Sequence, residues 1–325
     1  MHTVRSTLVV MDSQQPSEPV LHRAKMIARA TSSHLHLLVC NKGNQQSAYL
    51  NDLKGYLCEE GYSVSAQQAW QGSIHRTIIA AQQAEGCGLV IKQHLNDNPL
   101  TKALLTPEDW KLLRYCPSPV VMVKTNRHWT GGTFLAAVDA GSTDVEHRIL
   151  HSGIVSHGYD IAQLTGGTLH LMCAHPYPML SSSDPLFQRK ESIQDYYRDQ
   201  CRRFQHEFHI NDEHLHVEEG PPDVLIPYMA HKLEVALTVI GSVARSGLRG
   251  ALIGNTAEMI LDSLDSDVLV LKPDDIIPHL EELAAPAPSA TADDAPFAWP
   301  YSHNPDRTCH EEEVSTPRPP LSLVR

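Results

Sequence analysis

The residues whose types and spacing could do chemistry lie in one glycine-rich segment, IGSVARSGLRGALIGNTA, at residues 240–257. It follows an apolar run with the character of a buried strand, Val235–Ile240, and ends on Asn255–Glu258, which is typical of a helix start. Glycine lets a ligand approach the main chain closely, and the N–H groups at a helix N-terminus attract anions. The segment therefore predicts a phosphate-binding loop, although a mobile strand–helix connection would have the same composition.

Alternating strands and helices surround this segment. In the first part of the chain, the apolar runs that predict strands are residues 7–12, 34–40, 62–70, 87–92 and 119–124. The segments between them with helical spacing are residues 19–30, 47–61, 73–85 and 107–115. This alternation predicts an α/β fold, a doubly wound parallel sheet with helices on both faces.

The same pattern then occurs a second time. The second set of predicted strands is residues 133–139, 165–173, 214–218, 235–240 and 267–272, with helices at 147–164, 181–208, 222–232 and 256–264. The first strand of each set ends on an aspartate, Asp12 or Asp139. A repeat of about 140 residues indicates two copies of one domain, because solenoid units are far shorter.

The glycine segment resembles the signature of the universal stress protein family, which is Gly, two residues, Gly, nine residues, and then Gly followed by Ser or Thr. Gly241 and Gly254 stand at the expected spacing. Ala244 replaces the second glycine, and Asn255 replaces the hydroxyl residue, with Thr256 one position later. The chain thus looks like a tandem member of this family over about residues 7–272.

Two longer strings resemble the E type of that family: TPEDWKLLRYCPSPV at 106–120 and GNTAE at 254–258. The resemblance implies two repeated five-stranded sheets of the Rossmann-like, adenine nucleotide alpha hydrolase-like kind. Residues 1–128 would be a first, degenerate domain and residues 129–275 a second domain with a partial nucleotide-binding signature. Residues 276–325, rich in proline and alanine, are expected to be a disordered tail.

The two copies differ in the loop. Gln93, Asn96 and Thr106 stand in the first copy where the second has Gly241, Ala244 and Gly254. Nucleotide binding in the family manner is therefore expected only in the second copy. There the resemblance implies an adenosine and phosphate site, with ATP as the cofactor that it would hold, made by Ala137, Asp139, Cys173, Ala174, Gly241, Ala244, Gly254, Asn255 and Thr256.

Each part of that site has a plainer interpretation. Asp139 could cap the loop that follows it instead of holding a ribose hydroxyl. Arg245 and Arg249 could pair with phosphates or be solvated surface charges. A zinc site formed by His206, His209, His214 and His216 is conceivable from their spacing, but a histidine-rich surface explains the same residues, and no metal is predicted.

Composition limits the partners. The net charge of −12 argues against nucleic acid and anionic membranes, and no apolar run is long enough to span a bilayer. The opening residues lead directly into a strand, so no signal peptide is expected. Seven cysteines without CxxC spacing indicate reduced thiols and the cytoplasm.

The sequence shows no GxxxxGK[ST] motif and no GxSxG motif, so catalysis has little support. The resemblance implies a non-enzymatic stress-response protein that senses a ligand and contacts other proteins. It also implies that the fifth strands, 120–123 and 268–271, pair within the chain as an internal pseudo-dimer; a further homodimer is left open.

Two alternatives remain. One is an ATP-binding switch with slow hydrolysis in the second copy. The other is a binder of a bulky nucleotide-sugar or partly apolar ligand. The walls of its site would come from apolar side chains of the predicted helix 181–208, which could equally well belong to the hydrophobic core. These residues are Leu186, Phe187, Ile193, Tyr196, Tyr197 and Phe204.

Overall fold

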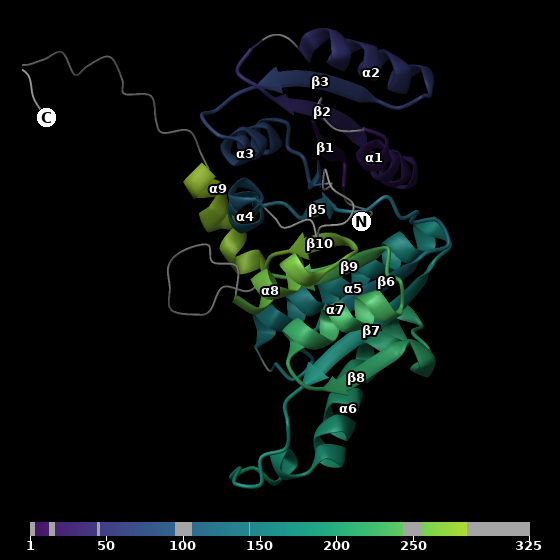
Figure 1. Ribbon diagram of the computed structural model, residues 1–325, viewed down its shortest axis with the longest axis vertical. Helices are drawn as coiled ribbons and strands as arrows, with labels where there is room; N and C mark the ends of the chain where they lie inside the picture. Colours follow the sequence, from purple (N-terminus) through teal and green to yellow (C-terminus); the bar gives the residue numbers. More distant parts are fainter. Residues whose placement is uncertain are drawn as a thin grey trace, which may run out of the picture. The chain divides into compact units, whose positions relative to one another are not determined.

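One mostly parallel sheet of ten strands organises the computed structural model, which describes residues 4–12, 17–43, 46–94, 106–142, 144–242 and 255–284 (Figure 1). The strand order is β3-β2-β1-β4-β5-β10-β9-β6-β7-β8. In the first half the strands are β1 Ser6–Met11, β2 His34–Cys40, β3 Val64–Ala69, β4 Leu89–Gln93 and β5 Val120–Val123. In the second half they are β6 Thr133–Val138, β7 Thr168–His175, β8 Leu215–Glu219, β9 Leu237–Gly241 and β10 Asp267–Leu271.

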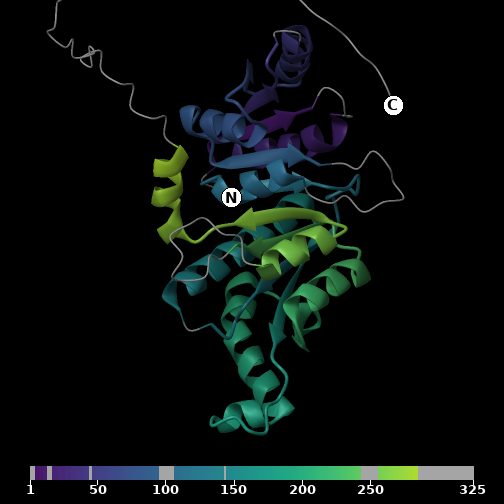
Figure 2. The same cartoon turned by 60° about the vertical axis from the view of Figure 1, so that its left-hand side comes forward.

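The two halves join through their fifth strands. β10 runs antiparallel to β5, with Val268 opposite Met122 and Leu269 opposite Val121. Figure 2 shows the two strands side by side in the middle of the sheet. The predicted pairing of these strands is confirmed, and so is the predicted α/β fold class. The domain boundary predicted at residues 128 and 129 stays a prediction.

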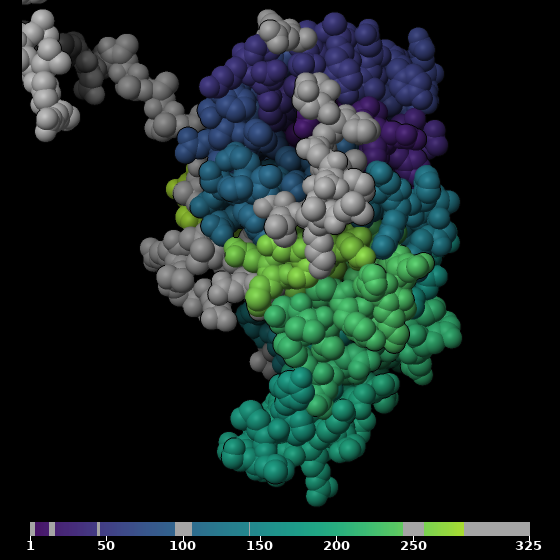
Figure 3. All heavy atoms as spheres, viewed as in Figure 1, coloured from purple at the N-terminus to yellow at the C-terminus, as the bar shows by residue number. Residues whose placement is uncertain are grey.

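Helices cover both faces of the sheet. Those that pack on one face are α1 Glu18–Thr31, α2 Ser47–Glu59, α5 Val145–Thr165 and α6 Lys190–Phe208. Those on the other face are α3 Ile74–Ala84, α4 Pro107–Tyr115, α7 Pro222–Lys232 and α8 Asn255–Ser263. In Figure 3 the yellow-green surface of α8 lies between the blue first half and the green α7. Arg114 of α4 and Glu258 of α8 form an ion pair, with 2.9 Å between the charged groups.

Each half repeats the strand order 3-2-1-4-5. The crossover helices change face between β1 and β4 in the first half, and between β6 and β9 in the second. Ligands of such sheets bind at this point, outside the carboxyl ends of the strands. Because β5 and β10 are antiparallel, the two equivalent positions lie at opposite edges of the sheet.

Two elements differ from the sequence prediction. The helix expected from residue 181 begins at Lys190, because Pro185–Gln188 forms a separate 3₁₀ turn, η2, whose first turn is capped by the Asp184 side chain. The tail expected from residue 276 instead starts with a helix, α9 Ile277–Ala284. Leu280 of α9 is 1% exposed, and Gln83 of α3 donates a hydrogen bond to the Glu281 carbonyl. This anchoring corrects the tail prediction for these residues; the rest of the tail lies outside the described residues.

A buried carboxylate fixes the connection between the halves. Asp267, at the start of β10, accepts hydrogen bonds from Arg23 Nε at 3.0 Å and from Trp129 Nε1 at 2.9 Å. Its other oxygen accepts from the backbone N–H groups of Lys124 and Thr125, both at 2.9 Å. Asp267 is fully buried. The segment between β5 and β6 is therefore held at one place against both halves.

Candidate functional site

A cavity of about 1240 Å³ opens at the carboxyl ends of β6, β7 and β9 in the second half. It lies at the point where the crossover helices change face, so both helix layers contribute to its walls. The apolar part of its lining includes Leu150 and Ile154 of α5, Ile226 of α7, Ile240 of β9, and Ala257 and Ile260 of α8. Its size is sufficient for a nucleotide or a molecule of similar bulk.

The polar lining is acidic and histidine-rich. The carboxylates at the cavity are Asp139, Asp144, Glu146 and Asp275, and the imidazoles are His147, His151 and His175. Within the described parts of the wall there is no lysine or arginine.

The structure brings together four of the residues predicted from the sequence. Ala137, Asp139, Ala174 and Gly241 all line the cavity. Cys173 does not, because successive strand residues face opposite sides of a sheet, and its side chain is buried in the core beneath α5 and α6. Ala244 and Gly254 lie outside the described residues. Asn255 and Thr256 begin α8, but only their backbone is described.

The end of β6 is closely packed. A Cβ atom at Gly141 would meet the hydroxyl oxygen of Tyr197 at a separation far below van der Waals contact, so the glycine admits the ring. Tyr197, from α6, is 7% exposed, and its ring centroid lies 5.7 Å from that of His175. Burial, followed by the nearby Asp139 charge, raises the pKa of Tyr197 to about 12. Tyr197 thus presents a neutral phenol to the cavity.

Gly241 has a similar role at the end of β9. A Cβ atom there would approach Leu150 Cδ2 to 2.7 Å and Ile154 Cδ1 to 3.1 Å. The glycine therefore allows α5 to pass close to the strand end. Sequence reasoning identified Gly241 from the loop spacing, but it assigned the residue to phosphate binding and not to helix packing.

In the first half, charged side chains of the protein itself occupy the position that corresponds to the cavity of the second half. Asp109 of α4 is fully buried, and its carboxylate lies 2.7 Å from Lys92 Nζ and 2.9 Å from His94 Nδ1. Thr106 caps the helix and donates to Asp109 through both its backbone N–H and its hydroxyl. Burial alone would raise the pKa of Asp109, but the His94 hydrogen bond and the Lys92 charge hold it well below its usual value.

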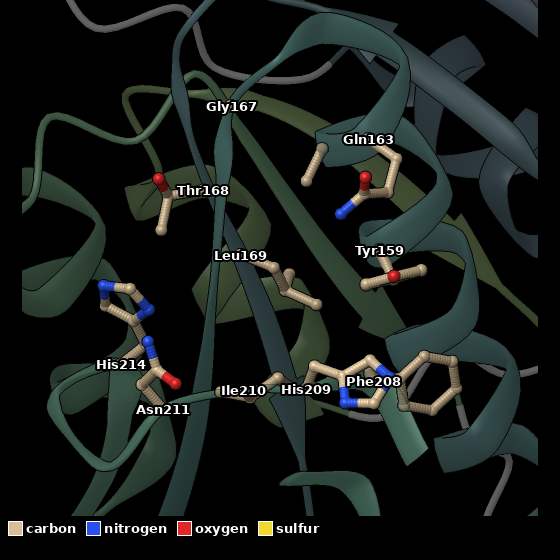
Figure 4. Close-up of a pocket in the computed structure, with 11 residues that line it drawn as sticks. Tyr159, Gln163, Gly167, Thr168, Leu169, Phe208, His209, Ile210, Asn211 and His214 are labelled. Atoms are coloured by element: carbon tan, nitrogen blue, oxygen red, sulfur yellow. The ribbon is translucent and has the colours of Figure 1, made fainter. Parts of the chain in front are cut away.

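A smaller cavity of about 200 Å³ lies near the start of β7, and Figure 4 shows Tyr159, Phe208 and His214 among its lining residues. Beside it, His170 Nδ1 lies 2.9 Å from His216 Nε2, and the His170 and His214 rings are 4.6 Å apart. Even so, the described residues contain no group of three or more ligands suited to a metal ion. The conceivable zinc site is therefore not supported in this part of the chain.

Comparison with known proteins agrees with this architecture. The model of the universal stress protein family matches residues 133–272. Universal stress protein E of Escherichia coli strain K12 is 30% identical over 302 residues, which cover 84% of this chain and 96% of that protein. The chain belongs to the universal stress protein family. A functionally unknown protein from Pseudomonas aeruginosa PAO1 shares 62% identity, covers 87% of this chain and 98% of its own, and superposes with a TM-score of 0.79.

A more distant member of the universal stress protein family shares the fold. The structure of such a protein from Archaeoglobus fulgidus DSM 4304 is 16% identical, covers 83% of this chain and 99% of its own, and has a TM-score of 0.57. This likeness shows the fold, whereas the match to universal stress protein E confirms the family resemblance predicted over about residues 7–272. None of the described helices is both long enough and apolar enough to cross a membrane.

Several cavity residues were not identified from the sequence as site residues. His151 and His175 carried no motif, and neither did the segment after the last predicted strand, yet Pro273, Asp275 and Ile276 line the cavity. His175 does directly follow Ala174 at the end of a strand, and polar residues at strand ends are a signal for a site in such sheets. His151 carries no such signal, because only the path of α5 over the end of β6 brings it there.

Proposed function

We propose that this universal stress protein acts in the stress response by sensing a ligand, and that it binds an adenine nucleotide in the cavity of its second half. The observation that supports this most directly is the position of Asp139. Its exposed carboxylate follows β6 at the mouth of the cavity, beside Gly141 and Ala137. An ionised carboxylate at this place can accept hydrogen bonds from the hydroxyl groups of a ribose.

The contrast between the halves supports a single site per chain. In the first half, the N-terminus of α4, which would attract a phosphate, already holds the Asp109 carboxylate. In the second half, Ala257 stands at the corresponding position and leaves space.

The six described cysteines are free thiols, which fits a reducing compartment such as the cytoplasm.

Calorimetric titration with ATP and magnesium tests the proposal, after the purified protein has been shown to be free of ligand. We expect one site per chain, with affinity lowered at least about tenfold in Asp139→Ala. Asp12→Ala is the matched control, because Asp12 directly follows β1 as Asp139 directly follows β6. No heat at millimolar ATP would contradict the proposal, and so would equal losses in both variants.

A partly apolar ligand is the second candidate, and one observation favours it. The described lining combines aliphatic side chains with carboxylates and lacks a cation, which suits an apolar group better than a triphosphate. Native mass spectrometry of protein taken directly from cells separates the candidates. A retained mass well above that of a mononucleotide would favour this second ligand class.

A further inference from the structure

The hydroxyl group of Tyr197 is open to the cavity, although most of the side chain is buried. Tyr197 lines the cavity and is 7% exposed. Among the described residues its hydroxyl has no hydrogen-bond partner, yet the oxygen is not one of the buried polar atoms that solvent cannot reach. Buried tyrosines usually direct this group to a partner. The free hydroxyl can therefore donate one hydrogen bond to a ligand and accept another.

Three neighbours hold the Tyr197 ring in place. Its hydroxyl oxygen packs on Gly141 so closely that a Cβ atom would not fit there. Its ring centroid lies 5.7 Å from that of His175 and 5.6 Å from that of Tyr196, whose ring stands nearly perpendicular to it. A hydroxyl group that packing already fixes loses little conformational entropy when a ligand binds to it.

The carboxylate of Asp139 belongs to the same part of the cavity. Asp139 begins the tight turn after β6, in which the backbone N–H of Ser142 donates to the Asp139 carbonyl at 3.2 Å. Gly141, on which Tyr197 packs, lies within that turn, whose first and last Cα atoms are less than about 7 Å apart. After burial, the Asp139 charge is the largest cause that raises the pKa of Tyr197 to about 12. A carboxylate that only accepts and a phenol that stays protonated thus face the ligand together.

We infer that Tyr197 is a specificity-determining residue that recognises, together with Asp139, two neighbouring hydroxyl groups of the ligand, so that the cavity selects ribonucleotides over deoxyribonucleotides. This rests on the proposed function. Asp139 accepts a hydrogen bond from a ribose hydroxyl, and Tyr197 donates one to an oxygen of the same diol. A ligand that lacks one hydroxyl leaves one of these protein groups without its partner, which lowers the affinity.

The test compares ATP with 2′-deoxy-ATP and 3′-deoxy-ATP, each of which lacks one hydroxyl group, by calorimetric titration with magnesium. The wild-type protein should prefer ATP over at least one deoxy form by about tenfold or more. Tyr197→Phe keeps the ring and removes the hydroxyl, and should reduce this preference at least about threefold. Gly141→Ala keeps the hydroxyl, but its methyl group must displace the phenol, so it should reduce the preference in the same way.

The control is Tyr196→Phe, the same substitution one residue earlier, because Tyr196 does not belong to the described lining of the cavity; the preference for ATP should stay unchanged. Thermal melting confirms that each variant folds. A preference that persists in Tyr197→Phe, or equal wild-type affinity for all three nucleotides, overturns the inference while ATP binding stands, and means that the hydroxyl contacts water. No ATP binding to the wild-type protein overturns the proposed function and this inference with it.

Discussion

The carboxylate of Asp109 lies 2.7 Å from the ammonium nitrogen of Lys92, at the place where the second half has Ala257 next to Ile240. These positions are equivalent because β4 and α4 of the first half align with β9 and α8 of the second half. In the first half, a side-chain carboxylate thus lies at the N-terminus of the helix. The other half has an apolar pair at this position and a cavity beside it.

This relationship predicts which substitution should prevent nucleotide binding in the cavity of the second half. Ala257→Asp would place a carboxylate at the N-terminus of α8, where a phosphate would otherwise bind, and repulsion should lower ATP affinity at least about tenfold. Ala257→Asn has the same size without the charge, and it should retain most of the affinity. Titration calorimetry measures both, and equal effects of the two variants would show that volume and not charge decides binding.

The same pair predicts a stability effect in the first half. Asp109→Asn removes the charge that compensates Lys92, whose side chain is only 16% exposed. Loss of one partner from a buried pair costs about 3 kcal/mol of unfolding free energy, measurable by urea denaturation. Asp199→Asn is the control, because Asp199 and its partner Arg202 are both well exposed, and its effect should stay below about 0.5 kcal/mol. Similar losses in the two variants would contradict the structural role of Asp109.

The connection between the halves should depend on Asp267. Asp267→Asn turns an amide group toward the donors from Arg23, Trp129 and the backbone after β5, and should cost about 3–5 kcal/mol of unfolding free energy. Asp265→Asn, two residues earlier and partly exposed, should cost less than about 1 kcal/mol. Denaturant unfolding of both variants decides this. A small effect at Asp267 would mean that strand pairing alone fixes the two halves.

Much of the fold followed from the sequence because its signals are local and repeated. Apolar runs at constant offsets predicted both sets of strands. The matching apolar runs Val120–Val123 and Val268–Leu271 belong to the fifth strands, whose pairing was expected and whose antiparallel direction the structure adds. The helix α9 was missed because one buried leucine, Leu280, holds it, and a single residue is a weak pattern within a segment that resembles a tail.

The site was only partly predictable. Asp139 and Gly241 stand at strand ends, where pattern and position agree. The choice between Cys173 and Ala174 depends on which face of β7 each one takes, and the sequence left both open. His151 becomes relevant only through burial and its contact with the Asp139 backbone. Such contacts between distant segments leave no signal in one sequence.

The buried histidines also predict a pH dependence of stability. Burial, and then the positive charges of His147 and Arg203, lower the pKa of His151 to about 4 from the ordinary value of 6.5. Between these values the unfolded chain binds a proton that the folded protein does not. The free energy of unfolding therefore falls as the pH decreases from 6.5 toward 4, and His151 contributes about 1–2 kcal/mol of that loss by pH 5.

Urea denaturation at pH 7 and pH 5 measures this contribution. His151→Gln removes the titrating group, so the variant should lose about 1–2 kcal/mol less than the wild-type protein over that interval. His170 gives a second, independent case, because burial and the neighbouring His214 and His216 lower its pKa to about 4 as well. His206→Gln, at an exposed position on α6, should follow the wild-type dependence. If His151→Gln also follows it, His151 is protonated equally in the folded and unfolded states, which would contradict the lowered pKa.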